Sequence, residues 1–163
     1  MSIANFLPDI LATGIAALAL VVSIVQYHRE GNRTRKEATI HAFDKLEEEK
    51  SIIFLFGCTK ANIDNLVKRR KEHDQRINDE WDNLDKALPL IEHFAVGINS
   101  KIYDSETLNK MAGNQLISTF NACRSLIDYK RNGAGKEKNY SEFEEMVNCL
   151  IQIRKKNNQS IPA

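Results

Sequence analysis

The sequence predicts an all-α protein, with a single N-terminal transmembrane helix followed by a cytoplasmic antiparallel helical bundle. Three observations carry this prediction: residues 10 to 26 hold no charge, later apolar residues recur at helical spacing, and no stretch alternates as a half-buried strand does. The average composition is 42% hydrophobic and 28% charged, with a net charge of +1. This average conceals the difference between an uncharged N-terminal segment and a charged remainder. We divide the 163 residues into an anchor (1–30), a helical domain (31–155) and a frayed tail (156–163).

The first element is the uncharged run from Ile10 to Gln26. As a helix rising about 1.5 Å per residue it measures roughly 25 Å, which approaches the thickness of the hydrocarbon core of a bilayer. A cleavable signal peptide needs a basic region before its apolar run, but no Lys or Arg precedes Arg29. We interpret the run as a membrane span. A buried helix of a soluble domain and a removed signal peptide are the alternatives.

The basic residues beside the predicted span all follow it. Four of them lie within ten residues of its end, namely Arg29, Arg33, Arg35 and Lys36. Positive-inside bias then places the C-terminal part in the cytoplasm and the N-terminus outside, as a single-pass protein of the inner (plasma) membrane. We expect these four side chains to contact anionic lipid headgroups. The three widely spaced cysteines agree with a reducing compartment.

One face of the predicted span carries only small and polar side chains. At about 100° per residue, positions spaced three and four apart share an arc of the helix. Small residues let helix backbones approach inside a bilayer, where packing drives association. We expect a homo-oligomer; the alternative is that alanine is merely common in spans. The residues predicted to mediate self-association are Ala12, Ala16, Ala19, Ser23 and Gln26.

Capping residues and breakers place the next helices. Gly31-Asn32 is expected to end the first helix, and Thr34 with Glu37 matches a capping box that starts a second. Gly57 interrupts the apolar run at 52–56. Apolar residues are sparse from 68 to 80, where we expect a solvated helix or a loop.

The clearest apolar periodicity lies between residues 81 and 98, with spacings of three and four. Pro89 lies inside it and predicts a kink or a break near Leu88. A further helix, capped by Asp104 or Ser105, ends near Arg131, and a last helix begins at Ser141. The predicted core contains Trp81, Leu84, Leu88, Ile91, Leu116, Phe120, Ile127 and Leu150.

Two stretches of the helical domain resemble a known family. They are "LPLIEHFAVGINSKIYDSETL" (88–108) and "IDYKR" (127–131). They resemble a domain-of-unknown-function family of small bacterial and prophage-borne proteins with one N-terminal span. Pro89 replaces the asparagine usual in that family. The resemblance implies an ion pair between Glu92 and Arg131, to which an exposed Glu92 carboxylate is the alternative. The prophage-borne members of the family suggest a role in phage defence.

No stretch carries a catalytic or metal-binding signature. The "GAGK" at 133–136 lacks the spacing of a phosphate-binding loop, and the four histidines are scattered. We therefore expect no enzymatic activity, no cofactor and no metal. The basic run Lys68–Lys71 is surrounded by acidic residues and lacks interleaved aromatics, so we interpret it as a solvated helix face and do not expect nucleic acid as a partner.

The sequence thus suggests a membrane-anchored, self-associating effector or assembly protein. We expect it to sense an unidentified protein partner in the cytoplasm, such as a phage protein, and to perturb the membrane, for instance by forming a pore in prophage-encoded phage defence (abortive infection). Its other expected partners are the lipid bilayer and further copies of itself. The alternative is a passive, membrane-tethered adaptor or regulator.

Overall fold

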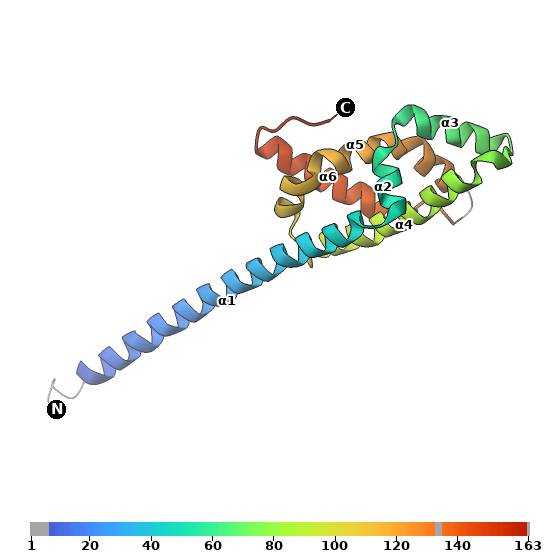
Figure 1. Ribbon diagram of the computed structural model, residues 1–163. Helices are drawn as coiled ribbons and strands as arrows, with labels where there is room; N and C mark the ends of the chain where they lie inside the picture. The colour runs from blue at the N-terminus through green and yellow to red at the C-terminus, as the bar shows by residue number, and fades with distance from the viewer. Residues whose placement is uncertain (1–6, 133–134, 163) are drawn as a thin grey trace. The chain divides into compact units, whose positions relative to one another are not determined.

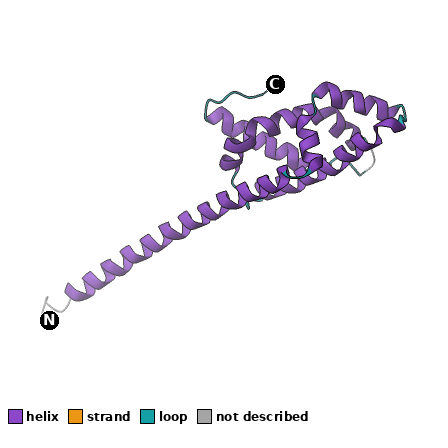
Figure 2. Ribbon diagram, in the orientation of Figure 1, coloured by secondary structure: helices purple, strands orange, loops and turns teal. Residues whose placement is uncertain are grey.

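Helices and short connections make up the chain in this computed structural model (Figures 1 and 2). The structure describes residues 7–132 and 135–162, with side chains from residue 19 onward. Within these residues six α-helices pack in a bundle, so the predicted all-α class is confirmed. They are α1 (Leu7–Glu47), α2 (Lys50–Gly57), α3 (Lys60–Lys71), α4 (Asn78–Asn99), α5 (Ser105–Arg131) and α6 (Ser141–Lys156), with the 3-10 turn η2 (Gln75–Ile77) before α4.

The helix α1 continues through the predicted stop at Gly31. The Thr34 hydroxyl donates a hydrogen bond to the Glu30 carbonyl at 2.9 Å, inside the helix, instead of capping a new one. A glycine inside a helix costs about 1 kcal/mol relative to alanine, which is too little to end a helix by itself. The predicted helix boundary at residues 31–34 is therefore wrong. By compactness the chain divides slightly later, into Met1–Arg35 and Lys36–Ala163.

The described residues contain no helix that combines the length and the apolar character of a membrane-crossing segment. The first half of the predicted span, with Ala12 and Ala16, belongs to the part of α1 whose side chains lie outside the described residues.

The second unit buries a continuous apolar core. Its helices pack as the pairs α2–α4, α3–α5, α4–α6 and α5–α6. Phe120 of α5 and Phe143 of α6 meet edge to face, with ring centroids 5.2 Å apart. All the predicted core residues are buried, which confirms the predicted faces: Trp81, Leu84, Leu88, Ile91, Leu116, Phe120, Ile127 and Leu150.

The helix α4 also continues through Pro89. The proline ring is exposed, whereas Leu88 and Ile91 on the opposite face are fully buried. Proline removes one backbone hydrogen bond, but packing of an apolar face supplies most of the stability of a helix inside a protein. The break predicted near Leu88 does not occur.

Local signals at the later helix ends agree better with the structure. Asp104 caps α5, because its Oδ1 accepts a hydrogen bond from the Thr107 amide at 2.8 Å. α6 begins at Ser141, as predicted. The tail beyond α6, for which the sequence predicts fraying, lies against α5 and α6: Asn109 Nδ2 donates to Gln159 Oε1 at 3.0 Å and Arg154 Nε donates to the Ser160 carbonyl at 2.7 Å.

Candidate functional site

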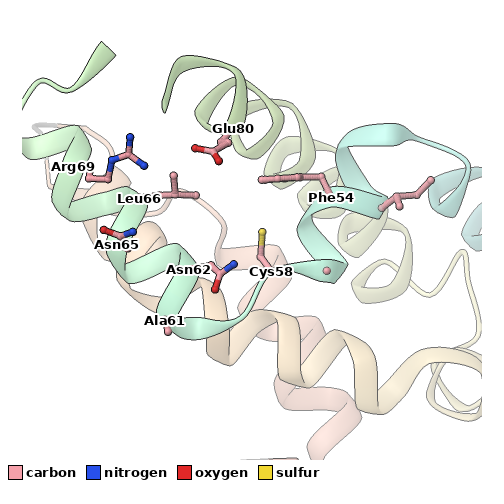
Figure 3. Close-up of a pocket in the computed structure, with 10 residues that line it drawn as sticks. Phe54, Cys58, Ala61, Asn62, Asn65, Leu66, Arg69 and Glu80 are labelled. Atoms are coloured by element: carbon pink, nitrogen blue, oxygen red, sulfur yellow. The ribbon is translucent and has the colours of Figure 1, made fainter. Parts of the chain in front are cut away.

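The candidate site is an open cleft of about 540 Å³ between α2, α3 and the start of α4. Figure 3 shows four side chains converging on it: the Cys58 sulfur, the Phe54 ring from α2, Arg69 from α3 and Glu80 from α4. The amides of Asn62 and Asn65 line the α3 side. The cleft therefore offers one aromatic surface, a positively charged hydrogen-bond donor in Arg69, a negatively charged acceptor in Glu80, and the neutral amides.

The start of α3 fixes the amide side of this cleft. Thr59 is the N-cap, and its hydroxyl oxygen accepts a hydrogen bond from the Asn62 amide at 3.3 Å. The same hydroxyl donates to Asn62 Oδ1 at 2.6 Å. At the other end of α3, Arg69 pairs with Asp74 at 3.0 Å. Both contacts orient side chains of the cleft wall before any ligand arrives.

The thiol in the cleft is not an activated nucleophile. Burial, reinforced by the Glu80 carboxylate, raises the pKa of Cys58. Burial, with a smaller effect of Cys58, raises the pKa of the neighbouring Cys123 to about 12. A reactive cysteine needs a lowered pKa, because the thiolate is the nucleophile. The arrangement is suited to binding a polar group rather than to attack by sulfur.

Metal ligation has no structural support in the described part of the chain. No group of three or more His, Cys, Asp or Glu side chains there is placed to hold an ion. Its three cysteines are all free, and Cys123 is buried.

A second, apolar groove of about 420 Å³ runs between the end of α1 and α4. Ala42 and Leu46 of α1 form one wall, and Leu90 and Val96 of α4 form the other. Ile102, in the turn after α4, also lines the groove and is 60% exposed. This groove leaves more apolar surface open than the cleft beside Cys58.

The predicted self-association residues are only partly within the described side chains. Ala19, Ser23 and Gln26 are exposed on α1, and Ser23 Oγ donates to the Ala19 carbonyl at 2.8 Å. Ala12 and Ala16 lie outside the described side chains. Self-association through this arc stays a prediction.

The predicted headgroup contacts also stay a prediction. Arg29, Arg33 and Lys36 are exposed, whereas Arg35 is partly buried. Arg33 and Arg35 also interact with other residues of the chain.

Glu92 and Arg131 do not pair with each other; both instead hold the start of α6. The Glu92 carboxylate accepts hydrogen bonds from the amides of Phe143 at 2.7 Å and Glu142 at 3.2 Å. Arg131 donates to Glu144 Oε2 at 2.8 Å. The expected ion pair between Glu92 and Arg131 therefore does not form, and the partner of each residue is in α6.

The cleft residues Cys58, Arg69 and Glu80 were not singled out by the sequence. They come from three separate segments, and no local spacing links them. Only the packing of α2, α3 and α4 brings them together.

Comparison with known families identifies the chain. A family model described as Domain of unknown function (DUF4760) matches residues 13–149. The chain belongs to the DUF4760 family. The match begins inside the predicted anchor and ends within α6, so it covers most of both predicted parts. No curated protein and no solved structure matches the chain. The expected resemblance to a domain of unknown function is confirmed. Membership of the DUF4760 family does not by itself imply a particular activity.

Proposed function

We propose that this DUF4760 protein is a membrane-anchored, self-associating helical protein that recognises a protein partner through its folded domain. One observation carries the proposal: between residues 20 and 25, large apolar side chains stand exposed on the faces of α1 that the small-residue arc with Ala19 and Ser23 does not occupy. Leu20, Val21, Val22, Ile24 and Val25 are between 45% and 62% exposed. A helix with so wide an apolar surface and no charged face is normally buried in a protein or in a membrane. Such a surface needs a cover that a single chain in water does not provide.

A lipid bilayer is the cover that the flanking sequence favours. The uncharged run extends from Ile10 to Gln26, and basic residues follow it on one side only. In this proposal the helix is a single-pass anchor in the inner (plasma) membrane, with the C-terminal domain in the cytoplasm. A C-terminal alkaline phosphatase fusion should then be inactive, because that enzyme folds only outside the cytoplasm; periplasmic phosphatase activity would refute this orientation.

Further copies of the chain cover the small-residue arc in this proposal. The Ser23 hydroxyl already donates within the helix, so burying its proton in an apolar contact leaves no donor unsatisfied. Ala19 and Ser23 are small enough to let two helix backbones approach closely. A partner that displays several binding sites would raise the local concentration of spans and turn weak packing into assembly.

The apolar groove beside Leu90, Val96 and Ile102 supports the partner-binding half of the proposal. Grooves between helices receive amphipathic helices in many complexes, with apolar anchors at helical spacing. The raised pKa values of Cys58 and Cys123 disfavour nucleophilic attack by either thiol, and we propose no enzymatic activity. A role in phage defence would make the partner a phage protein, and membrane perturbation the output.

The test replaces Ala16 and Ala19 with Leu and measures crosslinking between copies in isolated membranes. The double variant should remain in the membrane fraction but lose the crosslink, because the added bulk blocks close approach. The matched control changes Val21 and Val25 to Leu, which adds bulk on other faces of the helix, and should keep the crosslink. Crosslinking that persists in the alanine double variant would exclude this seam.

A second experiment separates an effector from a passive adaptor. Expression of the protein is induced in cells that contain a dye sensitive to the membrane potential. A collapse of the membrane potential that the double variant abolishes identifies an effector, and an unchanged potential identifies a passive adaptor.

A further inference from the structure

A cationic cleft of about 520 Å³ lies where the end of α3, the start of α4 and the end of α5 meet. Four of the residues that line it are cations from three segments of the chain: Arg70, Lys71, Lys130 and Lys136. One carboxylate, that of Asp85, also lines it. We call this set the cationic cleft. It is separate from the cleft beside Cys58 and from the apolar groove.

Two aromatic rings hold the cations of this cleft in place. The Trp81 ring is 3% exposed, and its centroid lies 5.2 Å from the Arg70 guanidinium carbon and 4.9 Å from Lys130 Nζ. Tyr129 meets Trp81 edge to face at 5.5 Å, and Lys71 Nζ lies 5.9 Å from the Tyr129 ring. Each cation–π contact is attractive and offsets part of the repulsion between neighbouring cations.

The cleft carries more positive charge than its own carboxylate neutralises. Lys130 pairs with Asp85. Arg70 donates to the neutral Asn78 Oδ1 at 3.2 Å, and the ion pairs of the described residues include none for Arg70, Lys71 or Lys136. The net charge of the cleft lining is therefore +3, from four cations and one carboxylate, in a chain whose total is +1.

This arrangement alters the interpretation of the basic run Lys68–Lys71. Sequence alone predicts a solvated face without aromatics, but folding sets Trp81 and Tyr129 beside Arg70 and Lys71. An adjoining hollow of about 450 Å³ shares Arg70 and Tyr129 and adds His73 and Asp74, whose carboxylate pairs with Arg69 and Arg76. Solvated lysines and arginines do not need to converge on one concave site, so the convergence points to an anionic ligand.

We propose that the cationic cleft binds a phosphate group, supplied either by the headgroup of an anionic lipid or by a free phosphate compound. A phosphate carries up to two charges and several acceptor oxygens, so it can engage a guanidinium fork and neighbouring ammonium groups together. A carboxylate would neutralise only one of the three excess charges. A cleft of this volume suits a small group rather than a flat protein surface.

Nucleic acid is the competing ligand, and the geometry disfavours it. Sites that bind single strands stack bases on exposed aromatic rings. Trp81 is buried beneath Arg70 and Lys130, so a base has no access to its ring.

Trp81 supplies a direct readout, because it is the single tryptophan of the chain and lines the cleft. Full-length protein in neutral detergent micelles is titrated with inorganic pyrophosphate and, separately, with micelles that contain phosphatidic acid. We expect a saturable change in tryptophan emission with at least one of the two. Saturation by pyrophosphate identifies a free phosphate compound as ligand, and saturation by phosphatidic acid alone identifies a lipid headgroup.

Two variants distinguish binding in the cationic cleft from attraction to the overall positive charge of the surface. Arg70→Gln should weaken binding roughly tenfold or more, because a hydrogen bond to a charged group contributes about 1.5–3 kcal/mol. The matched control is Arg124→Gln, an exposed arginine 5.9 Å from the Phe120 ring that does not line the cleft; its affinity should equal that of the wild type. The proposal is overturned if neither probe changes the emission, if both variants behave alike, or if a single-stranded oligonucleotide binds more tightly than either probe.

Discussion

Glu92 should hold α6 against α4 by acting as a helix cap from a distance. Its carboxylate accepts hydrogen bonds from the amides of Phe143 and Glu142 in the first turn of α6, at 2.7 Å and 3.2 Å. Tyr140, the residue before α6, has a left-handed backbone with φ of 62° and provides no side-chain cap. Glu92 thus satisfies two amides that the local sequence leaves without an acceptor.

The size of its contribution follows from these two contacts. Loss of a helix cap costs about 0.5–2 kcal/mol, and loss of a carboxylate at the positive end of a helix adds about 0.3–1 kcal/mol. We expect Glu92→Ala to lower the free energy of unfolding by about 2 kcal/mol, since both acceptors are removed. Glu92→Gln should lower it by about 1 kcal/mol, since one acceptor oxygen remains without the charge.

Urea unfolding of the full-length protein in neutral detergent, followed by circular dichroism, measures these differences. The matched control is Glu145→Ala, which removes an exposed carboxylate from the same helix and should change the free energy by less than about 0.5 kcal/mol. Equal losses in the Glu92 and Glu145 variants would show that general charge, and not capping, sets the effect.

Three further changes test other parts of the structure. Leu84→Ala, at a fully buried position of α4, should lower the free energy of unfolding by about 2–5 kcal/mol, and an unchanged urea midpoint would mean that the buried face is assigned wrongly. Gly113→Ala should lower the melting temperature, because the new Cβ would overlap Asn109 Oδ1, whose buried side chain is held by hydrogen bonds to Gln159 and Arg154; melting at the wild-type temperature would contradict that close approach. Stability should also fall as pH rises from about 9 towards 12, because the unfolded Cys123 thiol loses its proton near the ordinary pKa of 9.0 while the folded thiol, with a pKa of about 12, retains it. The slope of this loss approaches about 1.4 kcal/mol per pH unit at most. Cys123→Ala should remove this component, and identical pH slopes in the two proteins would contradict it.

Local signals in the sequence predicted much of the helical domain. The apolar seam through Trp81 and Ile91, the cap at Asp104 and the start of α6 at Ser141 depend on spacing within one turn or a few turns. Such patterns act over short distances, so they survive folding unchanged. The core of α4 was therefore predictable before any contact was known.

Residues that weaken a helix, such as Gly31 and Pro89, predicted the helix ends less well. Their free-energy cost ends a helix only where it exceeds the stability that the helix gains from packing. Gly31 and Pro89 each weaken a helix, yet α1 and α4 continue through them. Around Pro89, the burial of Leu88 and Ile91 stabilises the helix by more than the proline destabilises it. A single sequence does not reveal how much apolar surface a helix buries, so it does not predict whether a breaker succeeds.

The candidate sites depended on contacts between distant segments and could not be predicted. The family resemblance implies that Glu92 is one half of an ion pair, but its partners are amides 50 and 51 residues away. The sequence predicts a solvated face at Arg70, because Trp81 and Lys130 join it only in the folded chain. A site whose residues come from several separate segments produces no recognisable residue spacing within any one of them.

In the proposed function, a lipid bilayer covers the apolar surface of α1. The most direct measurement is the distribution of the full-length chain between pellet and supernatant after cell membranes are washed with alkaline carbonate, which strips peripheral proteins. A bilayer anchor predicts that the wild type stays in the pellet and that Leu18→Arg with Val21→Arg shifts the chain to the supernatant. Both positions are near the middle of the uncharged run Ile10–Gln26, and each arginine near the centre of a span costs about 2.5–3.5 kcal/mol. A wild-type chain recovered in the supernatant would contradict the anchor.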